Sequence, residues 1–360
     1  MENIMNNSDQ IIQEDLSFIA QAALPWAELA GKNVLITGAS GALPAYMVET
    51  ILYLNEKVFE AKATIFALVR NEAKAKARFK RYENNPYLKF IIQDVCDKIV
   101  VDDDLDYIIH AASQASPKYY GQDPVGTLLP NVLGTYHLLE LARQKRLKAF
   151  LFFSSSTVYG KMIANDGSAA EADFGVLNPL TIAACYPESK RMGETMCAAW
   201  LSQYQIPIKI IRPFHTYGPG ISLDDGRVFA DFCKNIINDE AISLNSDGSA
   251  KRAFCYLADA TIGFFTVLLK GEVGEAYNVA GAEEISILEL ARLLVGLFPE
   301  KNIDISYQEN TNKGYLKTAV TSYVPNSNKL KALGWQQKYP IKEGFRRMIT
   351  NYLNELGSEA

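Results

Sequence analysis

The sequence predicts an α/β protein: a doubly wound parallel sheet followed by a smaller mixed α/β domain. Short apolar runs of strand length alternate with segments of helical periodicity from about residue 32 to about residue 211. Such alternation is typical of parallel sheets, whose strands are joined by right-handed helical crossovers. The first run ends in the glycine turn Gly38-Ala39-Ser40-Gly41, and the alternation stops after about residue 218.

The elements are expected in the following order. The strands are the apolar runs at 32–37, 63–69, 90–93, 107–110, 150–153 and 206–211. Helices are expected at 15–29, 45–54, 134–147, 286–298 and 341–356, and in the segment that begins with Tyr186. We expect an N-terminal extension (1–30), a dinucleotide-binding domain (31–217, with return segments near 253–270), a substrate domain (mainly 218–350) and a tail (351–360).

The composition indicates a globular protein without a nucleic-acid or membrane partner. The 360 residues carry a net charge of −5, and 48% are hydrophobic, whereas a nucleic-acid binder would show a basic surplus. No apolar run approaches the roughly 18 residues of a membrane span, and the N-terminus lacks the pattern of a secretory signal. Five scattered cysteines and three separated histidines predict reduced thiols, a cytoplasmic location and no metal site.

The glycine turn predicts a dinucleotide cofactor in a Rossmann-type domain. Glycines let the backbone approach a pyrophosphate, and the following helix presents free N–H groups to it. The residues expected in this loop are Gly38, Ser40, Gly41, Ala42 and Leu43. Pro44 stands where a third small residue is usual, so the packing of helix on strand is expected to differ there.

The residue after the second strand indicates which cofactor is used. Arg70 replaces the acidic residue that would hold the ribose 2′-hydroxyl of NAD, and an arginine suits a 2′-phosphate. NADP(H) is therefore favoured over NAD(H), the alternative being a surface arginine among basic neighbours. Further cofactor contacts are expected after the third and fourth strands, at Asp94, Val95, Ala111, Ala112 and Ser113. His110 is interpreted as a packed residue at a strand end.

A tyrosine and a lysine one helical turn apart indicate a reaction centre. Tyr186 and Lys190 lie on the same helix face, and Pro187 suits the first turn of that helix. We expect the Lys190 ammonium to lower the pKa of Tyr186 and so to make it a general acid or base. Two solvated helix residues are the alternative. The fifth strand runs into four hydroxyl residues, 154–157, which would face the ligand crevice of a parallel sheet.

Taken in order, these motifs resemble the extended short-chain dehydrogenase/reductase family, and within it the enzymes that modify nucleotide sugars. The resemblance covers roughly residues 31–350 and includes Tyr217-Gly218-Pro219. The segments similar to UDP-glucuronate decarboxylases are Asn178-Pro179, Ala184-Cys185-Tyr186, Lys190-Arg191, Glu194-Thr195-Met196-Cys197, Asp225-Gly226-Arg227-Val228 and Arg252-Ala253-Phe254. The resemblance implies a nucleotide-sugar substrate, a part in polysaccharide precursor synthesis, and a homodimer formed through helices that include the Tyr186 helix.

The resemblance also implies roles for single residues. Ser155, Tyr186 and Lys190 would be catalytic, and Tyr186 and Lys190 would also contact the cofactor. The implied substrate-binding residues are Ser155, Ser156, Thr157, His215, Arg227, Val228 and Arg252. Arg252 matches the arginine that holds the substrate diphosphate, a role that suits the fork of a guanidinium group.

Besides Pro44, four positions depart from the family pattern. Ser156 and Thr157 stand where sugar 4,6-dehydratases have Asp-Glu, and Thr157 also replaces the glutamate of the decarboxylases. Ala183 replaces an arginine before the tyrosine, and His215 replaces an asparagine. The remaining residues, Ser155, Tyr186 and Lys190, together with a nicotinamide, suit hydride transfer at the sugar C4. They do not include the acid and base that dehydration needs.

The favoured function is therefore reduction of a 4-keto-6-deoxy nucleotide sugar, which consumes NADPH and which Arg70 supports. A nucleotide-sugar 4-epimerase, similar to UDP-glucose 4-epimerase, is one alternative. A UDP-glucuronate decarboxylase is another, disfavoured by Thr157. A non-catalytic dinucleotide-binding subunit is the hypothesis from a different class, although such family members usually lose the tyrosine or the lysine, and both are present here.

Overall fold

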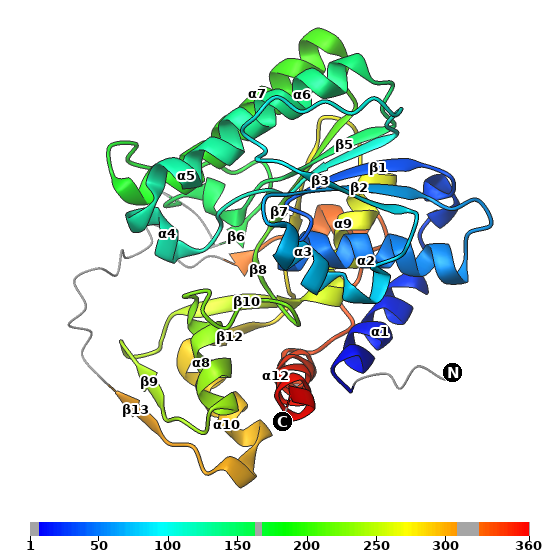
Figure 1. Cartoon of the computed structure of the whole chain (residues 1–360). Helices are drawn as coiled ribbons and strands as arrows, with labels where there is room; N and C mark the ends of the chain where they lie inside the picture. The colour runs from blue at the N-terminus through cyan, green and yellow to red at the C-terminus, as the bar shows by residue number, and fades with distance from the viewer. Residues whose placement is uncertain (1–6, 163–167, 308–323, 360) are drawn as a thin grey trace, which may run out of the picture.

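The computed structural model describes residues 7–162, 168–307 and 324–359. Its central strands are β1 (Asn33–Thr37), β2 (Thr64–Val69), β3 (Leu88–Ile92), β4 (Tyr107–His110), β5 (Ala149–Phe153), β7 (Ile208–Pro213) and β11 (Ala276–Val279). They form one sheet in the order β11-β7-β5-β4-β1-β2-β3, and each neighbouring pair is parallel (Figure 1). The strand order reverses between β1 and β4, and ligands of such sheets bind where that reversal opens a crevice.

Helices cover both faces of this sheet because successive strand residues point in opposite directions. Val34 and Ile36 of β1 pack in one core with α2 (Ala42–Lys57) and α9 (Leu257–Lys270). Leu35 packs in a second core with α6 (Thr135–Gln144) and α7 (Cys185–Tyr204). The other helices of this region are α3 (Glu72–Arg78), α4 (Pro117–Gln122) and α5 (Pro124–Leu129), and a π-helical turn (Pro130–Gly134) joins α5 to α6.

The second domain is a mixed structure below the carboxyl edge of the sheet (Figure 1). Its three-stranded sheet has β10 (Lys251–Tyr256) between β8 (His215–Tyr217) and β12 (Glu284–Ser286), and β13 (Ile305–Tyr307) pairs with β9 (Ile242–Leu244). A small pair joins β14 (Val324–Pro325) to β6 (Ser168–Ala169). The helices are α8 (Val228–Ile237), α10 (Ile287–Leu297), α11 (Asn328–Ala332) and α12 (Ile341–Glu359).

The predicted fold class is confirmed, and all six predicted strands are present with shifts of at most a few residues. The seventh strand, β11, is not among the six strands that the sequence predicts. The helix predicted at 15–29 is wrong: α1 spans Asn7–Ala20, and only a short 3₁₀ turn covers Trp26–Leu29. Pro25 explains the break, because proline has no N–H to donate within a helix. Residues 351–359, assigned to a tail, continue α12.

Candidate active site

The expected pyrophosphate loop is a tight contact between two strand ends. Gly38 has φ +65°, and a Cβ built on it would lie 2.7 Å from the Ala112 Cα in the loop after β4. Only glycine combines that backbone angle with so close an approach. Helix α2 begins directly after Gly41, so its first N–H groups, those of Ala42 and Leu43, face this loop.

Two features of this loop fit a dinucleotide. The uncapped N–H groups at the start of α2 suit a pyrophosphate bound by the backbone, and an unpaired buried hydroxyl suits a polar ligand group. The Ser113 Oγ is buried and has no hydrogen-bond partner within the described part of the chain. Pro44 is buried in the first turn of α2, where its missing N–H costs nothing, so this departure is compatible with the site.

Arg70 and Asp94 follow the ends of β2 and β3, two neighbouring strands of the parallel sheet. The Arg70 Nη1 is 3.6 Å from the Asp94 Oδ2, with 60% and 38% of the two side chains exposed. Burial opposes ionisation of Asp94, but the Cys96 N–H, which donates at 2.9 Å, and the Arg70 charge together hold its pKa below the usual value. Arg70 is thus an exposed cation beside the second and third strands. Val95 is buried and lies against Gly134 of the π-helical turn.

The three predicted catalytic side chains lie together. Ser155 follows β5, whereas Tyr186 and Lys190 lie on the first turns of α7, and all three are buried. The Tyr186 phenol shares a hydrogen bond with Ser155. The Lys190 Nζ donates to the Phe153 carbonyl at 2.6 Å and lies 5.7 Å from the centroid of the Tyr186 ring. The interpretation of Tyr186 and Lys190 as solvated helix residues is therefore wrong.

The predicted acidity of Tyr186 is also wrong. Burial raises the pKa of Tyr186 above its usual value, and the Ser155 hydrogen bond and the Arg227 charge only partly oppose that rise. Burial lowers the pKa of Lys190 to about 7, although the nearby Glu194 and Cys197 favour its charged form. Removing both groups from water disfavours their charged forms more than their proximity favours them.

Thr157 contacts Ser155 directly. Its hydroxyl donates to the Ser155 Oγ at 3.0 Å, and its backbone N–H lies 3.2 Å from the same oxygen. Because Ser155 accepts both bonds, its own proton is directed toward Tyr186 or a substrate oxygen. The neighbouring Ser156 is half-buried at the start of the same 3₁₀ turn.

The predicted substrate residues come together across β8, β10 and the start of α8. His215 on β8 is paired with Phe254 on β10, the strand that carries Arg252, and Val228 is the first residue of α8, directly after Arg227. Burial lowers the pKa of His215 to about 3, and the charges of Arg252 and Arg227 add to this effect. His215 is therefore neutral beside two guanidinium groups. Arg227 itself is held by Asp225, whose Oδ2 accepts from its Nη2 at 3.0 Å.

Sequence reasoning missed an aromatic side chain at the centre of the site. The Tyr120 ring, on α4, stacks on the Tyr186 ring with centroids 5.2 Å apart and an interplanar angle of 14°. Its hydroxyl donates to the Ala115 carbonyl at 3.0 Å. A short segment between two prolines carries no periodic signal that would have indicated this contact.

His110 is buried and joins the end of β1 to the start of α6, which confirms its interpretation as a packed residue at a strand end. Its Nδ1 is 2.9 Å from the Thr37 Oγ1, and its Nε2 is 3.1 Å from the Thr135 Oγ1. Thr37 accepts from the N–H groups of Ala111 and Ala112 at 3.2 Å each, so its own proton is free to go to His110. Burial lowers the pKa of His110 to about 3, so the ring is neutral.

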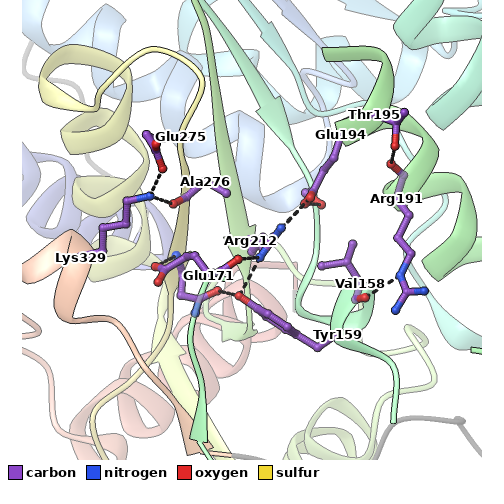
Figure 2. Close-up of polar contacts among 12 residues, drawn as sticks. Val158, Tyr159, Glu171, Arg191, Glu194, Thr195, Arg212, Glu275, Ala276 and Lys329 are labelled. Carbon is purple, nitrogen blue, oxygen red and sulfur yellow. Dashed lines mark hydrogen bonds and ion pairs between the residues drawn. The ribbon is translucent and has the colours of Figure 1, made fainter. Parts of the chain in front are cut away.

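A second polar network joins α7 to β7 (Figure 2). The Arg212 Nε and Nη2 donate to the two Glu194 carboxylate oxygens at 2.9 and 2.7 Å. The Arg212 Nη1 donates to the Tyr159 hydroxyl and the Glu171 carbonyl, at 2.9 Å each. Tyr159 in turn donates to the Asn278 Oδ1 at 2.7 Å, so β7, α7 and β11 are joined.

Comparison with known proteins identifies the family. Residues 34–280 match the NAD dependent epimerase/dehydratase family. The chain belongs to this family. It is 30% identical over 326 residues to UDP-glucuronic acid decarboxylase 6 of Arabidopsis thaliana, covering 90% of each chain, and 31% identical over 321 residues to decarboxylase 3 of the same plant, covering 89% of each. The protein is accordingly an NAD-dependent enzyme that modifies nucleotide sugars.

Solved structures share the fold at lower identity. A UDP-glucose 4-epimerase of Thermotoga maritima has a TM-score of 0.76 at 21% identity, covering 90% of this chain and 99% of its own. A UDP-glucuronic acid 4-epimerase of Bacillus cereus, with UDP-glucuronic acid and NAD, has a TM-score of 0.74 at 22% identity, with coverages of 90% and 99%. No helix within the described ranges is long and apolar enough to cross a membrane.

Proposed function

We propose that the protein transfers hydride at C4 of a nucleotide sugar and that its reaction is the reduction of a 4-keto-6-deoxy sugar with NADPH. The observation that carries the proposal is the buried group of Ser155, Tyr186 and Lys190 beside Thr157. This group offers hydrogen-bond donors to a C4 oxygen. Residues 156 and 157, which follow it, carry hydroxyls and no carboxylate that could remove a proton from the sugar ring.

The residues at the carboxyl edge of the sheet fit the cofactor. The 38–43 loop and the N-terminus of α2 would hold its pyrophosphate, and the exposed Arg70 guanidinium would hold the 2′-phosphate of NADP. Lys190, which is directed by the Phe153 carbonyl, would donate to the nicotinamide ribose. When bound, the nicotinamide supplies the hydride that the sugar carbon receives.

The raised pKa of Tyr186 is compatible with reduction. In that direction Ser155 and Tyr186 donate hydrogen bonds to the ketone oxygen, and Tyr186 gives its proton as the oxygen becomes a hydroxyl. A proton donor must hold its proton at neutral pH, and the buried phenol, whose pKa is raised, does so. A 4-epimerase would also need Tyr186 as a base for an initial oxidation, which the same burial disfavours.

The two arginines of the second domain would hold the substrate diphosphate. Arg227 and Arg252 both lie close enough to His215 for their charges to lower its pKa, so they face a common region. One guanidinium group can donate two parallel hydrogen bonds to phosphate oxygens. The neutral His215 near both arginines adds no further charge and offers a donor and an acceptor to the sugar or the nucleotide.

UDP-glucuronate decarboxylation is the second candidate, because relatives at 30% identity over 90% of the chain carry that name. Thr157 opposes it, since a hydroxyl already donated to Ser155 does not replace a carboxylate. Efficient release of carbon dioxide from UDP-glucuronate by the purified protein would favour this candidate over reduction.

The first test identifies the cofactor and then the reaction. Freshly purified protein is denatured, any released nucleotide is identified, and NADPH consumption is then followed with a 4-keto-6-deoxy nucleotide sugar. We expect little retained cofactor, substrate-dependent loss of NADPH, and a loss of about 100-fold or more in kcat for Tyr186→Phe. Stoichiometric retained NAD without net oxidation would contradict the reductase and favour an epimerase or decarboxylase. Unchanged activity in Tyr186→Phe would contradict the catalytic role of this tyrosine.

The protein is proposed to act as a homodimer. Large apolar side chains are 36–64% exposed along α5, α6, α7 and the π-helical turn between α5 and α6: Val125, Leu128, Leu133, Tyr136, Met192 and Tyr204. These elements pack against one another, so the side chains lie on neighbouring surfaces. An apolar surface of this kind next to the catalytic helix suits a second copy of the chain.

A further inference from the structure

Within the described structure, Glu194 is the one acidic residue that connects the segment of Ser155, after β5, to the helix of Tyr186 and Lys190, α7. It lies one helical turn after Lys190 on α7 and is largely buried. Its Oε1 accepts from the Ser154 Oγ at 2.5 Å, and Ser154 directly precedes Ser155. The Phe153 carbonyl, one residue earlier, accepts from Lys190. The end of β5 is thus fastened to α7 at two successive residues.

Arg212 fixes the position of Glu194 in turn. It donates to both carboxylate oxygens from β7 (Figure 2). Its side chain is only 6% exposed. Its remaining Nη1 is held by Tyr159 and by the Glu171 carbonyl. A bidentate pair with both partners anchored leaves the carboxylate little freedom to rotate.

We propose that Glu194, with Arg212 as its fixed counter-ion, is a positioning residue that holds Ser155 and Lys190 in register with Tyr186. The inference rests on the proposed function in that it takes these three residues as the reacting group. Glu194 acts through Ser154 on the position of Ser155. It acts through its charge on Lys190.

The charge effect makes the inference testable apart from turnover. The groups that face Lys190 are Tyr186, Glu194 and Cys197 on α7 and His110 from β4. His110 is neutral, and burial raises the pKa of Tyr186 and Cys197, so Glu194 is the anion among these groups. Replacing it by the neutral isostere in Glu194→Gln should therefore lower the pKa of Lys190 further.

The experiment compares four proteins: wild type, Glu194→Gln, Ser154→Ala and Glu188→Gln. Glu188 is the matched control, because it also pairs with an arginine on α7, Arg191 at 3.6 Å, but does not contact Ser154. Lys190 is titrated by NMR of lysines labelled with ¹³C at Cε, and Lys190→Met assigns the signal. In Glu194→Gln we expect the midpoint to fall by about one pH unit. In Ser154→Ala and Glu188→Gln we expect no shift.

Activity provides the second measurement. We expect kcat to fall about 10- to 100-fold in Glu194→Gln, with little change in KM for the sugar, because displacing a reacting group mainly affects the chemical step. The basic limb of the pH profile should move to lower pH along with the Lys190 midpoint. Ser154→Ala, which leaves no buried charge unpaired, should lose about 3- to 10-fold in kcat through the lost hydrogen bond.

The outcomes separate this inference from the proposed function. An unshifted Lys190 midpoint in Glu194→Gln, or wild-type kcat in both Glu194→Gln and Ser154→Ala, would overturn the positioning role. If Glu194→Gln does not fold, wild-type kcat in Ser154→Ala overturns it and reduced kcat supports it. If wild-type protein binds NADPH but reduces no sugar, the proposed function is wrong, and the Lys190 titration alone decides the role of Glu194.

Discussion

Tyr186 lies on the first turn of α7 with its phenol removed from water, stacked on Tyr120 and hydrogen-bonded to Ser155. In this environment the neutral phenol is favoured, and the nearby lysine loses rather than gains charge. Thr157 completes the arrangement by donating to Ser155. At the scale of the residue, the site is therefore a set of neutral hydrogen-bond donors suited to protonate a developing oxyanion.

Arg70 determines the expected cofactor preference. We predict that Arg70→Ser raises KM for NADPH about 10-fold and changes KM for NADH less than about 2-fold, because a charge-assisted phosphate contact contributes roughly 1.5–3 kcal/mol. Steady-state kinetics with both cofactors measure this effect. Lys76→Ser is the control, an exposed cation on α3 that pairs with Glu72. Equal losses with NADPH and NADH would contradict the assignment of Arg70 to a 2′-phosphate.

Helix α7 is the element on which the site depends, since it carries Tyr186, Lys190 and Glu194. It can lie close to β5 because Gly193 faces the sheet. A Cβ at Gly193 would lie 2.3 Å from the Phe152 Cζ, and Phe152 is fully buried. The same close packing lets Lys190 reach the carbonyl at the end of β5.

We predict that Gly193→Ala destabilises the protein despite the better helix propensity of alanine. Overpacking against Phe152 costs about 1–3 kcal/mol, which exceeds the gain of at most about 1 kcal/mol from the helix. Denaturant unfolding measures the difference. The matched control is Gly296→Ala on α10, where an added Cβ meets nothing within 4 Å and stability should stay equal or rise. Equal stability changes in the two variants would contradict the tight α7–β5 contact.

In the whole molecule, α1 joins the two domains through one buried carboxylate. Asp15 accepts from Tyr46 of α2 at 3.0 Å, Tyr256 of β10 at 2.7 Å and the Nη2 of Arg347, on α12, at 2.9 Å. Burial raises the pKa of Asp15 to about 6, although Arg347 and the two hydroxyls oppose this rise. The described part of the N-terminal extension, from residue 7 onwards, is therefore part of the folded core and not a separate arm.

This carboxylate should make stability depend on pH. The folded protein takes up a proton near pH 6, whereas unfolded Asp15 does so only near pH 4, so its contribution is greatest at acidic pH and is lost as pH rises through 6. We expect wild type to lose free energy of unfolding between pH 5 and pH 7.5. In Asp15→Asn this loss should be smaller by about 1–3 kcal/mol. Burial also raises the pKa of Asp259 to about 6, so the contribution of Asp259 to the pH dependence of stability remains in the variant. Denaturant titrations at both pH values test this.

The control for this prediction is Asp103→Asn, a half-exposed carboxylate that pairs with Lys89 at 3.7 Å. Its pH dependence should match wild type. An Asp15→Asn protein with the wild-type slope would show that Asp15 does not titrate in this range.

The proposed dimer is tested at the same scale. We predict that the wild-type protein has the mass of a dimer by light scattering and that Leu133→Glu with Met192→Glu gives a folded monomer. Placing carboxylates in an apolar interface costs several kcal/mol, enough to dissociate it. Val273→Glu with Val58→Glu is the control, since both valines are exposed outside the helices that carry this surface. A wild-type monomer at micromolar concentration would contradict the proposal.

The sequence alone predicted much of the fold because strand and helix periodicity are local properties. The six strands, the glycine turn and the placement of Ser155, Tyr186 and Lys190 followed from it, as did the membership of a nucleotide-sugar family. It did not predict β11, whose four residues join the sheet beside β7, far away in the chain. The helix predicted at 15–29 was also wrong, because Pro25 lies inside that range and a proline cannot continue the helix.

Tertiary structure decided what depends on burial and on distant partners. The chain shows that Tyr186 and Lys190 share a helix face, but only the folded protein shows how far both are removed from water, which sets the direction of their pKa shifts. The partners Glu194–Arg212, Tyr120–Tyr186 and Asp15–Arg347 come from separate elements. Local pattern fixes which side chains a segment presents, whereas desolvation and charge pairing depend on what the rest of the chain packs around them.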